Sequence, residues 1–132
     1  MFENVSTWKK QGDIGMAYAI AYYSKLGYTI SIPLTDSQDY DFIIDTGTDL
    51  LKVQAKTSSQ VSKHGIPIVS LKTNGGNRSG QDKVKTFENN SSDLLFVLLE
   101  NGSCYSIPTR NITSKNTINL GEKYLPYKVE LF

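Results

Sequence analysis

The sequence of 132 residues contains one cysteine, Cys104, and one histidine, His64. A single cysteine cannot form a disulfide bond within the chain, which favours a reducing compartment. Without a CxxC or HExxH motif, neither a structural zinc site nor a histidine-based triad is expected. No apolar run approaches the roughly 20 residues of a membrane span, and the N-terminal sequence lacks the apolar core of a signal peptide. These absences predict a cytoplasmic protein without a membrane partner.

The length suits one domain over residues 1–132, with ordinary fractions of hydrophobic and charged residues. Apolar spacing predicts a first helix over 10–26 and short helical pieces over 82–89 and 108–112, with a loop over 73–81. Strands are predicted over 28–32, 40–45, 50–56, 66–71, 94–99, 104–107, 117–120 and 127–131. The continuous apolar run 94–99 indicates a central strand buried on both faces, and Trp8 is expected in the core. The class is therefore α/β, a mixed sheet with flanking helices.

The stretch 39–57, DYDFIIDTGTDLLKVQAKT, predicts two strands joined by a turn. One register places the apolar residues on a common face: Asp45 opposite Leu50, Ile44 opposite Leu51 and Phe42 opposite Val53. Extended by one step, this register sets Asp41 opposite Gln54. Lys56 follows Gln54 by two residues and therefore lies on the same face. A carboxylate, an amide and an ammonium group are thus expected to converge on one side of the sheet.

Charge is unevenly distributed along the chain, although the net charge is only +1. Between residues 52 and 85 seven cationic residues oppose one acidic residue, a balance of +6, since seven minus one is six. Just upstream, five aspartates fall between residues 36 and 49 without a lysine or arginine. An acidic pocket beside a basic surface suits a protein that holds a divalent cation and contacts a phosphate backbone. An unevenly charged, solvated surface is the alternative interpretation.

The predicted hairpin carries groups that suit the hydrolysis of a phosphodiester. Asp41 supplies a hard anionic oxygen, and Gln54 and the backbone carbonyl of Ala55 supply neutral oxygens, which together could hold Mg²⁺ or Mn²⁺. Lys56 would stabilise charge on the phosphate or orient the attacking water. The candidate catalytic residues are therefore Asp41, Gln54 and Lys56. A functional role for Asp41 is favoured because an aspartate inside an apolar strand is unfavourable without a partner.

Asp41, with Gln54 thirteen positions later and Lys56 after one spacer, resembles the motif of the PD-(D/E)XK nuclease superfamily. The segments GDIGMAYAIAYYSKLGY, VQAKTSS and CYSIPTRNI resemble its group I intron homing endonuclease branch, and archaeal Holliday junction resolvases share the helix and hairpin. The resemblance covers nearly the whole chain. It implies a restriction-endonuclease-like core, magnesium-dependent cleavage of double-stranded DNA, a homo-oligomer (dimer or tetramer), and a prokaryotic or phage-encoded protein.

The chain departs from the family pattern at two positions. Gln54 stands where an acidic residue usually precedes the lysine, a replacement that the homing branch accepts. The family's glutamate on the first helix, in a GxxxE pattern beginning at Gly12, is Met16 here, and a thioether is a poor ligand for magnesium. Asp13 lies about one helical turn earlier and is a weak substitute. Two alternatives therefore remain: a DNA-binding module with reduced or lost cleavage, and a Holliday junction resolvase.

Polar and cationic residues near the motif are candidates for contact with DNA: Lys52, Ser58, Ser59, Lys63, His64, Lys72, Arg78 and Lys83. His64 lies in a polar stretch and is expected to be an exposed residue or a DNA contact rather than a catalytic base. Arg78 belongs to a glycine-rich stretch and is the residue expected to reach a groove or the DNA backbone. For each of these side chains, simple exposure to solvent is the alternative.

Overall fold

The computed structural model describes residues 1–74, 84–85 and 91–132. Its elements are α1 (Trp8–Lys25), β1 (Thr29–Ser31), β2 (Phe42–Asp45), β3 (Leu50–Ser58), β4 (Ile68–Ser70), β5 (Thr73–Asn74), β6 (Val84–Lys85), β7 (Leu94–Leu99), β8 (Cys104–Pro108), η2 (Thr109–Asn111), β9 (Thr117–Asn119), η3 (Glu122–Tyr127) and β10 (Lys128–Val129). The largest sheet has six strands in the order β1-β2-β3-β7-β8-β10, and only the β3–β7 pair in it is parallel. The predicted α/β class with a mixed sheet is confirmed.

Helix α1 begins and ends at residues that suit a helix boundary. The Thr7 side chain accepts a hydrogen bond from the Lys10 backbone N–H at 3.2 Å, and Gly27 after the last turn has a φ of +87°. Gly15, Ala19 and Tyr23 follow one another at four-residue spacing and are the buried residues of the helix. This narrow stripe faces the sheet, while much of the remaining surface of the helix is exposed.

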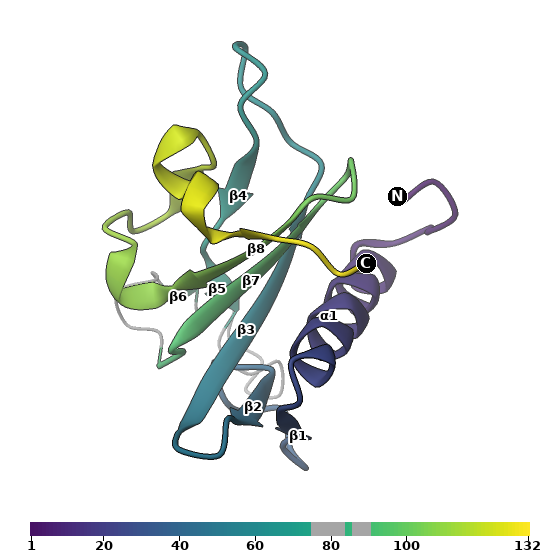
Figure 1. The fold of residues 1–132 in the computed structure, drawn as a ribbon. Coiled ribbons are helices and arrows are strands. Elements are labelled where there is room, and N and C mark those ends of the chain that lie inside the picture. The colour runs from purple at the N-terminus through teal and green to yellow at the C-terminus, as the bar shows by residue number, and fades with distance from the viewer. Residues whose placement is uncertain (75–83, 86–90) are drawn as a thin grey trace.

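The six-stranded sheet has a core on each face. On the α1 side, Tyr23 packs with residues of the sheet that include Phe42, Val53 and Phe96. On the other side, the two-stranded sheet of β4 and β9 and the helix η3 cover a second cluster that includes Leu95 and Val97. Figure 1 shows α1 on one side of the sheet and η3, in yellow, on the other. Strand β7 is buried on both faces, as predicted from its continuous apolar sequence.

Several local predictions were wrong. Trp8 is 82% exposed rather than buried, because the first turn of α1 is not covered by the core. Within the helix predicted over 82–89, Val84–Lys85 form strand β6, and the other positions lie outside the described residues. Of the loop predicted over 73–81, Thr73–Asn74 form strand β5, and the rest is likewise outside. No helix in the described ranges is long and apolar enough to cross a membrane.

Candidate active site

Asp41 lies at a bulge where β2 meets β3. Phe42 pairs with Val53, as predicted, but the backbone N–H of Asp41 also donates to the Val53 carbonyl, at 2.8 Å. Asp41 and Phe42 therefore both lie opposite Val53, which is the two-against-one arrangement of a β-bulge. The predicted pairing of Asp41 with Gln54 is wrong for this reason, although the remaining register of the hairpin is confirmed.

The bulge turns the side chain of Asp41 toward the backbone of β3. Its Oδ2 atom accepts a hydrogen bond from the Ala55 N–H at 2.7 Å. Within the described residues, its second oxygen has no hydrogen-bond partner. Burial raises the pKa of the Asp41 carboxyl, while the Ala55 N–H and the Lys56 ammonium act in the opposite direction. Asp41 is thus a partly buried acid with one oxygen left for a ligand.

Lys56 lies beside Asp41 and is held by the main chain. Its Nζ atom donates to the carbonyl oxygen of Lys72 at 2.8 Å. Burial lowers the pKa of Lys56, and the negative charge of Asp41 raises it. Gln54 is also buried, with 5% of its surface exposed. Gln54 and Lys56 pair with consecutive inward residues of β7, so both side chains lie on the face of the sheet that β4 covers.

Position 16 of α1 lies on the flank of the helix that faces β2, the strand next to Asp41. Gly15 packs directly over β3, because a Cβ atom there would be 2.5 Å from Thr57 Cγ2 and 3.9 Å from the Lys56 carbonyl oxygen. Successive helical residues are rotated by about 100°, so Met16 and Tyr18 lie on opposite sides of Gly15. Tyr18 lines a cavity with β10 and the turn before β8; Met16 therefore lies on the β2 side.

The structure gives no acidic oxygen at this helical position. Met16 packs against the apolar cluster on the α1 side of the sheet. Asp13, the expected weak substitute, is exposed to solvent on the same helix. The described residues contain no group of three or more histidine, cysteine, aspartate or glutamate side chains that could hold a metal ion.

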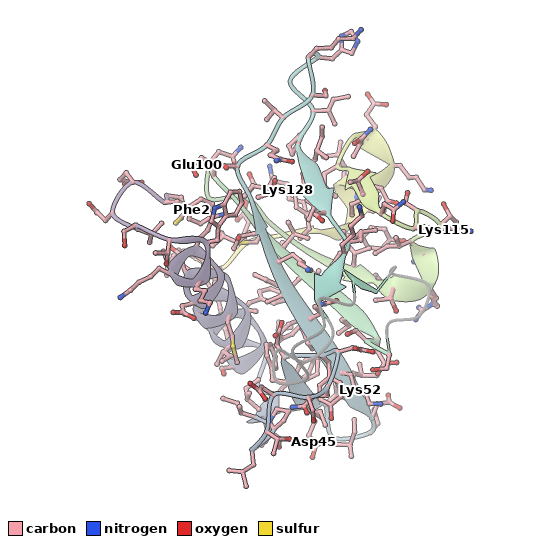
Figure 2. The ribbon with its side chains drawn as sticks, turned by 180° about the vertical axis from the view of Figure 1, so that it is seen from behind. Phe2, Asp45, Lys52, Glu100, Lys115 and Lys128 are labelled. Carbon is pink, nitrogen blue, oxygen red and sulfur yellow. The ribbon has the colours of Figure 1, made fainter. Side chains whose placement is uncertain are left out.

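The residues predicted to contact DNA differ in position and in exposure to solvent. Lys52 lies on β3, the strand of the Gln54–Lys56 motif, called the motif strand below. Its ammonium is 5.3 Å from the centre of the Tyr40 ring, and Figure 2 shows Lys52 at the end of the sheet where Asp45 lies. The exposed residues of the set are Ser59, Lys63, His64 and Lys72. Arg78 and Lys83 lie outside the described residues.

Ser58 differs from the exposed candidates for DNA contact. It belongs to β3 and is buried, its hydroxyl donates to the Ile68 carbonyl, and it accepts from the Gln60 N–H at 3.1 Å. This hydroxyl fastens the end of β3 to β4, so contact with a phosphate is not expected. The hydrogen bond from Lys56 to the Lys72 carbonyl could not be predicted from the sequence. Every residue has a backbone carbonyl, and only the packing of β4 brings that of Lys72 close to Lys56.

Comparisons with known proteins show the family of the chain and a solved structure of similar fold. The model of the PD-(D/E)XK endonuclease family matches residues 6–124. The solved structure of a bacterial homing endonuclease, I-Ssp6803I, is similar, with a TM-score of 0.76 and 27% sequence identity over 93% of this chain and 89% of that chain. No curated protein gives a significant sequence match. The matched segment contains Asp41, Gln54 and Lys56, and the chain belongs to the PD-(D/E)XK endonuclease family.

Proposed function

We propose that the protein is a metal-dependent endonuclease that hydrolyses phosphodiester bonds of double-stranded DNA at a specific site, as a homing endonuclease does. The observation that carries this proposal is the pair formed by Asp41 and Lys56, two charged groups that burial shifts away from their charged forms. Removing such groups from water costs free energy, and perturbed acids and bases are concentrated at functional sites. The family and the similarity to a homing endonuclease support the same function.

The residues present fit a divalent cation. Asp41 offers the carboxylate oxygen that has no hydrogen-bond partner among the described residues, and Gln54 and Ala55 offer an amide and a backbone carbonyl oxygen, all of them hard donors. Mg²⁺ or Mn²⁺ bound by these groups would supply positive charge to the phosphate in the transition state. Because the set has one charged ligand instead of two or three, we expect weak metal affinity, in a range where the metal concentration limits activity.

Lys56 acts on the phosphate or on the attacking water. An ammonium group has three N–H donors, and one of them is used by the Lys72 carbonyl. That bond restrains the side chain, and within the described ranges the other two donors remain for a phosphate oxygen or a water molecule. Burial lowers the pKa of Lys56, and the negative charge of Asp41 opposes part of this effect. Lys56 therefore supplies a fixed positive charge where negative charge develops during phosphodiester cleavage.

Binding to DNA uses cationic and polar residues of β3 and of the segments that follow it. Lys52, Ser59, Lys63, His64 and Lys72 would contact phosphates, with Arg78 and Lys83 as further candidates. One chain of 132 residues has little surface for a long recognition site. We therefore propose a symmetric homo-oligomer, a dimer or a tetramer, that places one site on each DNA strand.

A second candidate function follows from Met16. Its side chain packs against the apolar cluster of the sheet, where an acid of the family would complete the metal site. A chain with this substitution would bind DNA and cleave it slowly or not at all. Tight binding without turnover is the distinguishing property of this DNA-binding module.

The test is cleavage of a supercoiled plasmid library by the pure protein with Mg²⁺, Mn²⁺ or EDTA, with Asp41→Ala as control. The proposal expects nicking or linearisation with either metal, and none with EDTA or with Asp41→Ala. Equal, residual cleavage by both proteins would instead reveal a contaminating nuclease and refute the enzymatic proposal. A parallel assay with four-way junctions against linear duplexes of equal sequence tests for a resolvase.

A further inference from the structure

Trp8 is the largest exposed aromatic side chain near the motif strand, and it is the single tryptophan of the chain. It lines a hollow of about 300 Å³ together with residues that include Gln11, Ser59 and Glu100. Ser59 directly follows β3, the strand that carries Gln54 and Lys56. An exposed tryptophan that lines a hollow with polar residues is a typical contact for a planar or sugar-like group of a ligand.

The geometry of α1 relates this hollow to the candidate active site. Trp8 precedes Gly15 by seven residues, so the two lie on the same side of the helix about 10 Å apart. Gly15 lies over Lys56 and Thr57, close to the end of β3 at Ser58. Trp8, nearer the start of the helix, therefore lies beyond the end of β3. Lys9 precedes Met16 by the same interval and shares its side of the helix, the side of Asp41. A distance of 10 Å equals the rise of about three base pairs.

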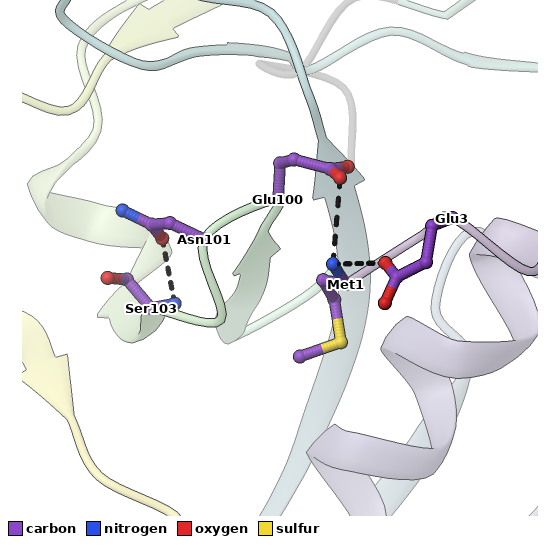
Figure 3. Close-up of polar contacts among 5 residues, drawn as sticks. All are labelled: Met1, Glu3, Glu100, Asn101 and Ser103. Atoms are coloured by element: carbon purple, nitrogen blue, oxygen red, sulfur yellow. Dashed lines mark hydrogen bonds and ion pairs between the residues drawn. The ribbon is translucent and has the colours of Figure 1, made fainter.

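The charges around Trp8 suit a polyanion. Lys9 and Lys10 are exposed, and the first turn of α1 contains no acidic residue. The acidic residues that line the hollow are Glu3 and Glu100. Both are paired with the amino group of Met1, at 2.6 Å and 3.6 Å (Figure 3). Their negative charge is thereby partly offset, which leaves the lysines to determine the local potential.

We propose that Trp8 and Lys9 form a second contact with the DNA substrate, at a nucleotide about three base pairs from the scissile phosphate. Trp8 packs against the sugar and base of that nucleotide, and Lys9 pairs with its phosphate. This contact rests on the proposed function, because it takes DNA as the ligand. It adds to the motif residues a positioning surface that fixes the register of the DNA on α1.

The tryptophan itself reports on this contact. Because it is 82% exposed, acrylamide should quench its fluorescence strongly in the free protein. Titration with duplex DNA in Ca²⁺ or EDTA, followed by anisotropy of labelled DNA, measures binding independently of Trp8. We expect the tryptophan emission to be quenched along the same binding curve and to become protected from acrylamide. DNA binding that leaves both tryptophan signals unchanged would refute the contact while the proposed function stands; absence of any DNA binding would refute both.

Single substitutions separate the contributions of Trp8 and Lys9 to DNA binding. We expect Trp8→Ala to weaken DNA binding about tenfold, and Lys9→Ala to lower the salt-dependence slope of log K by about 0.9, the value for one phosphate. Lys10→Ala is the matched control, because Lys10 lies seven residues before exposed Ala17 and points away from the site. Its slope should match that of the unaltered protein. Equal effects of Lys9→Ala and Lys10→Ala would show a general charge effect and overturn the assignment.

Discussion

The carboxylate of Asp41 accepts a 2.7 Å hydrogen bond from the backbone N–H of Ala55. In a regular hairpin this N–H would donate to a main-chain carbonyl of the neighbouring strand. The bulge at Asp41 shifts the backbone of that strand, so the carbonyl is no longer opposite the Ala55 N–H. A side chain has therefore replaced a backbone group in the ladder. This arrangement fixes the orientation of the acid without a second side chain, and it brings a carboxylate into a poorly hydrated position.

Replacement of Asp41 by asparagine should stabilise the fold at neutral pH. Below the ordinary pKa of 3.8 the acid is protonated in both the folded and the unfolded chain. As pH rises above this value the unfolded chain loses the proton first, because the folded pKa is raised, and the native protein loses stability relative to the variant. Urea unfolding without metal, from pH 3 to 7, measures the difference.

A comparison with Asp41→Ala separates charge from hydrogen bonding in that experiment. Alanine also removes the charge but leaves the Ala55 N–H without its acceptor, so it should be less stable than Asp41→Asn by about 1–2 kcal/mol. A gap between the unaltered protein and Asp41→Asn that does not change with pH would contradict the raised pKa.

Divalent metal should stabilise the native protein through Asp41. A ligand that binds only the folded state adds about 2.7 kcal/mol at a concentration 100 times its Kd. We expect Mg²⁺ or Mn²⁺ to raise the melting temperature of the unaltered protein, with reversal by EDTA, and to leave Asp41→Asn nearly unchanged. Differential scanning calorimetry makes the measurement. Equal shifts in both proteins would place the metal elsewhere.

Substitution of Lys56 and Lys52 by methionine should separate catalysis from binding. Lys56→Met removes the ammonium beside Asp41, and we expect a loss of kcat on the order of 100-fold or more with DNA affinity retained. Lys52→Met should weaken binding in a salt-dependent manner and change kcat little. Because burial lowers the pKa of Lys56, native activity should decline with rising pH before an ordinary lysine would lose its proton. Single-turnover cleavage measured against pH tests the loss of kcat and the decline at high pH, and DNA binding measured against salt concentration tests Lys52→Met.

Met16→Glu should increase cleavage. The substitution places a carboxylate on the β2 side of α1, at the position where the resemblance implies a helix acid, and would add a charged oxygen to the proposed metal site. We expect at least a tenfold lower metal concentration for half-maximal activity, since second-sphere and ligand changes typically alter affinity by that amount. Met16→Gln is the control for size and polarity. An unaltered metal requirement in Met16→Glu would show that position 16 does not reach the site.

Gly15→Ala should destabilise the fold, although alanine favours helices. The new methyl group would come within 2.5 Å of Thr57 Cγ2, and overpacking of this kind costs about 1–3 kcal/mol. Gly12→Ala is the matched control on the same helix, with no atom within 4 Å of its added methyl, and should gain up to about 1 kcal/mol. Thr57→Ser removes the clashing methyl but keeps the hydroxyl that accepts from Gln11, so it should rescue Gly15→Ala. Chemical unfolding of the four variants checks the ranking.

The sequence by itself determined the register of the β2–β3 hairpin, the buried central strand and the family. These features depend on short-range patterns: alternation leaves one register that buries Phe42 and Val53, and a slip of one residue would expose both. Trp8 shows the limit of such patterns, because whether an aromatic residue is buried depends on how far the sheet extends beneath the helix.

Only the tertiary structure decided the orientation of the candidate catalytic groups. The bulge aims Asp41 at Ala55, β4 brings the Lys72 carbonyl to Lys56, and the same strand occupies the hydroxyl of Ser58. Each of these contacts joins residues ten or more positions apart. Local propensity cannot specify them, because they arise when separately encoded elements pack and must satisfy one another's polar groups.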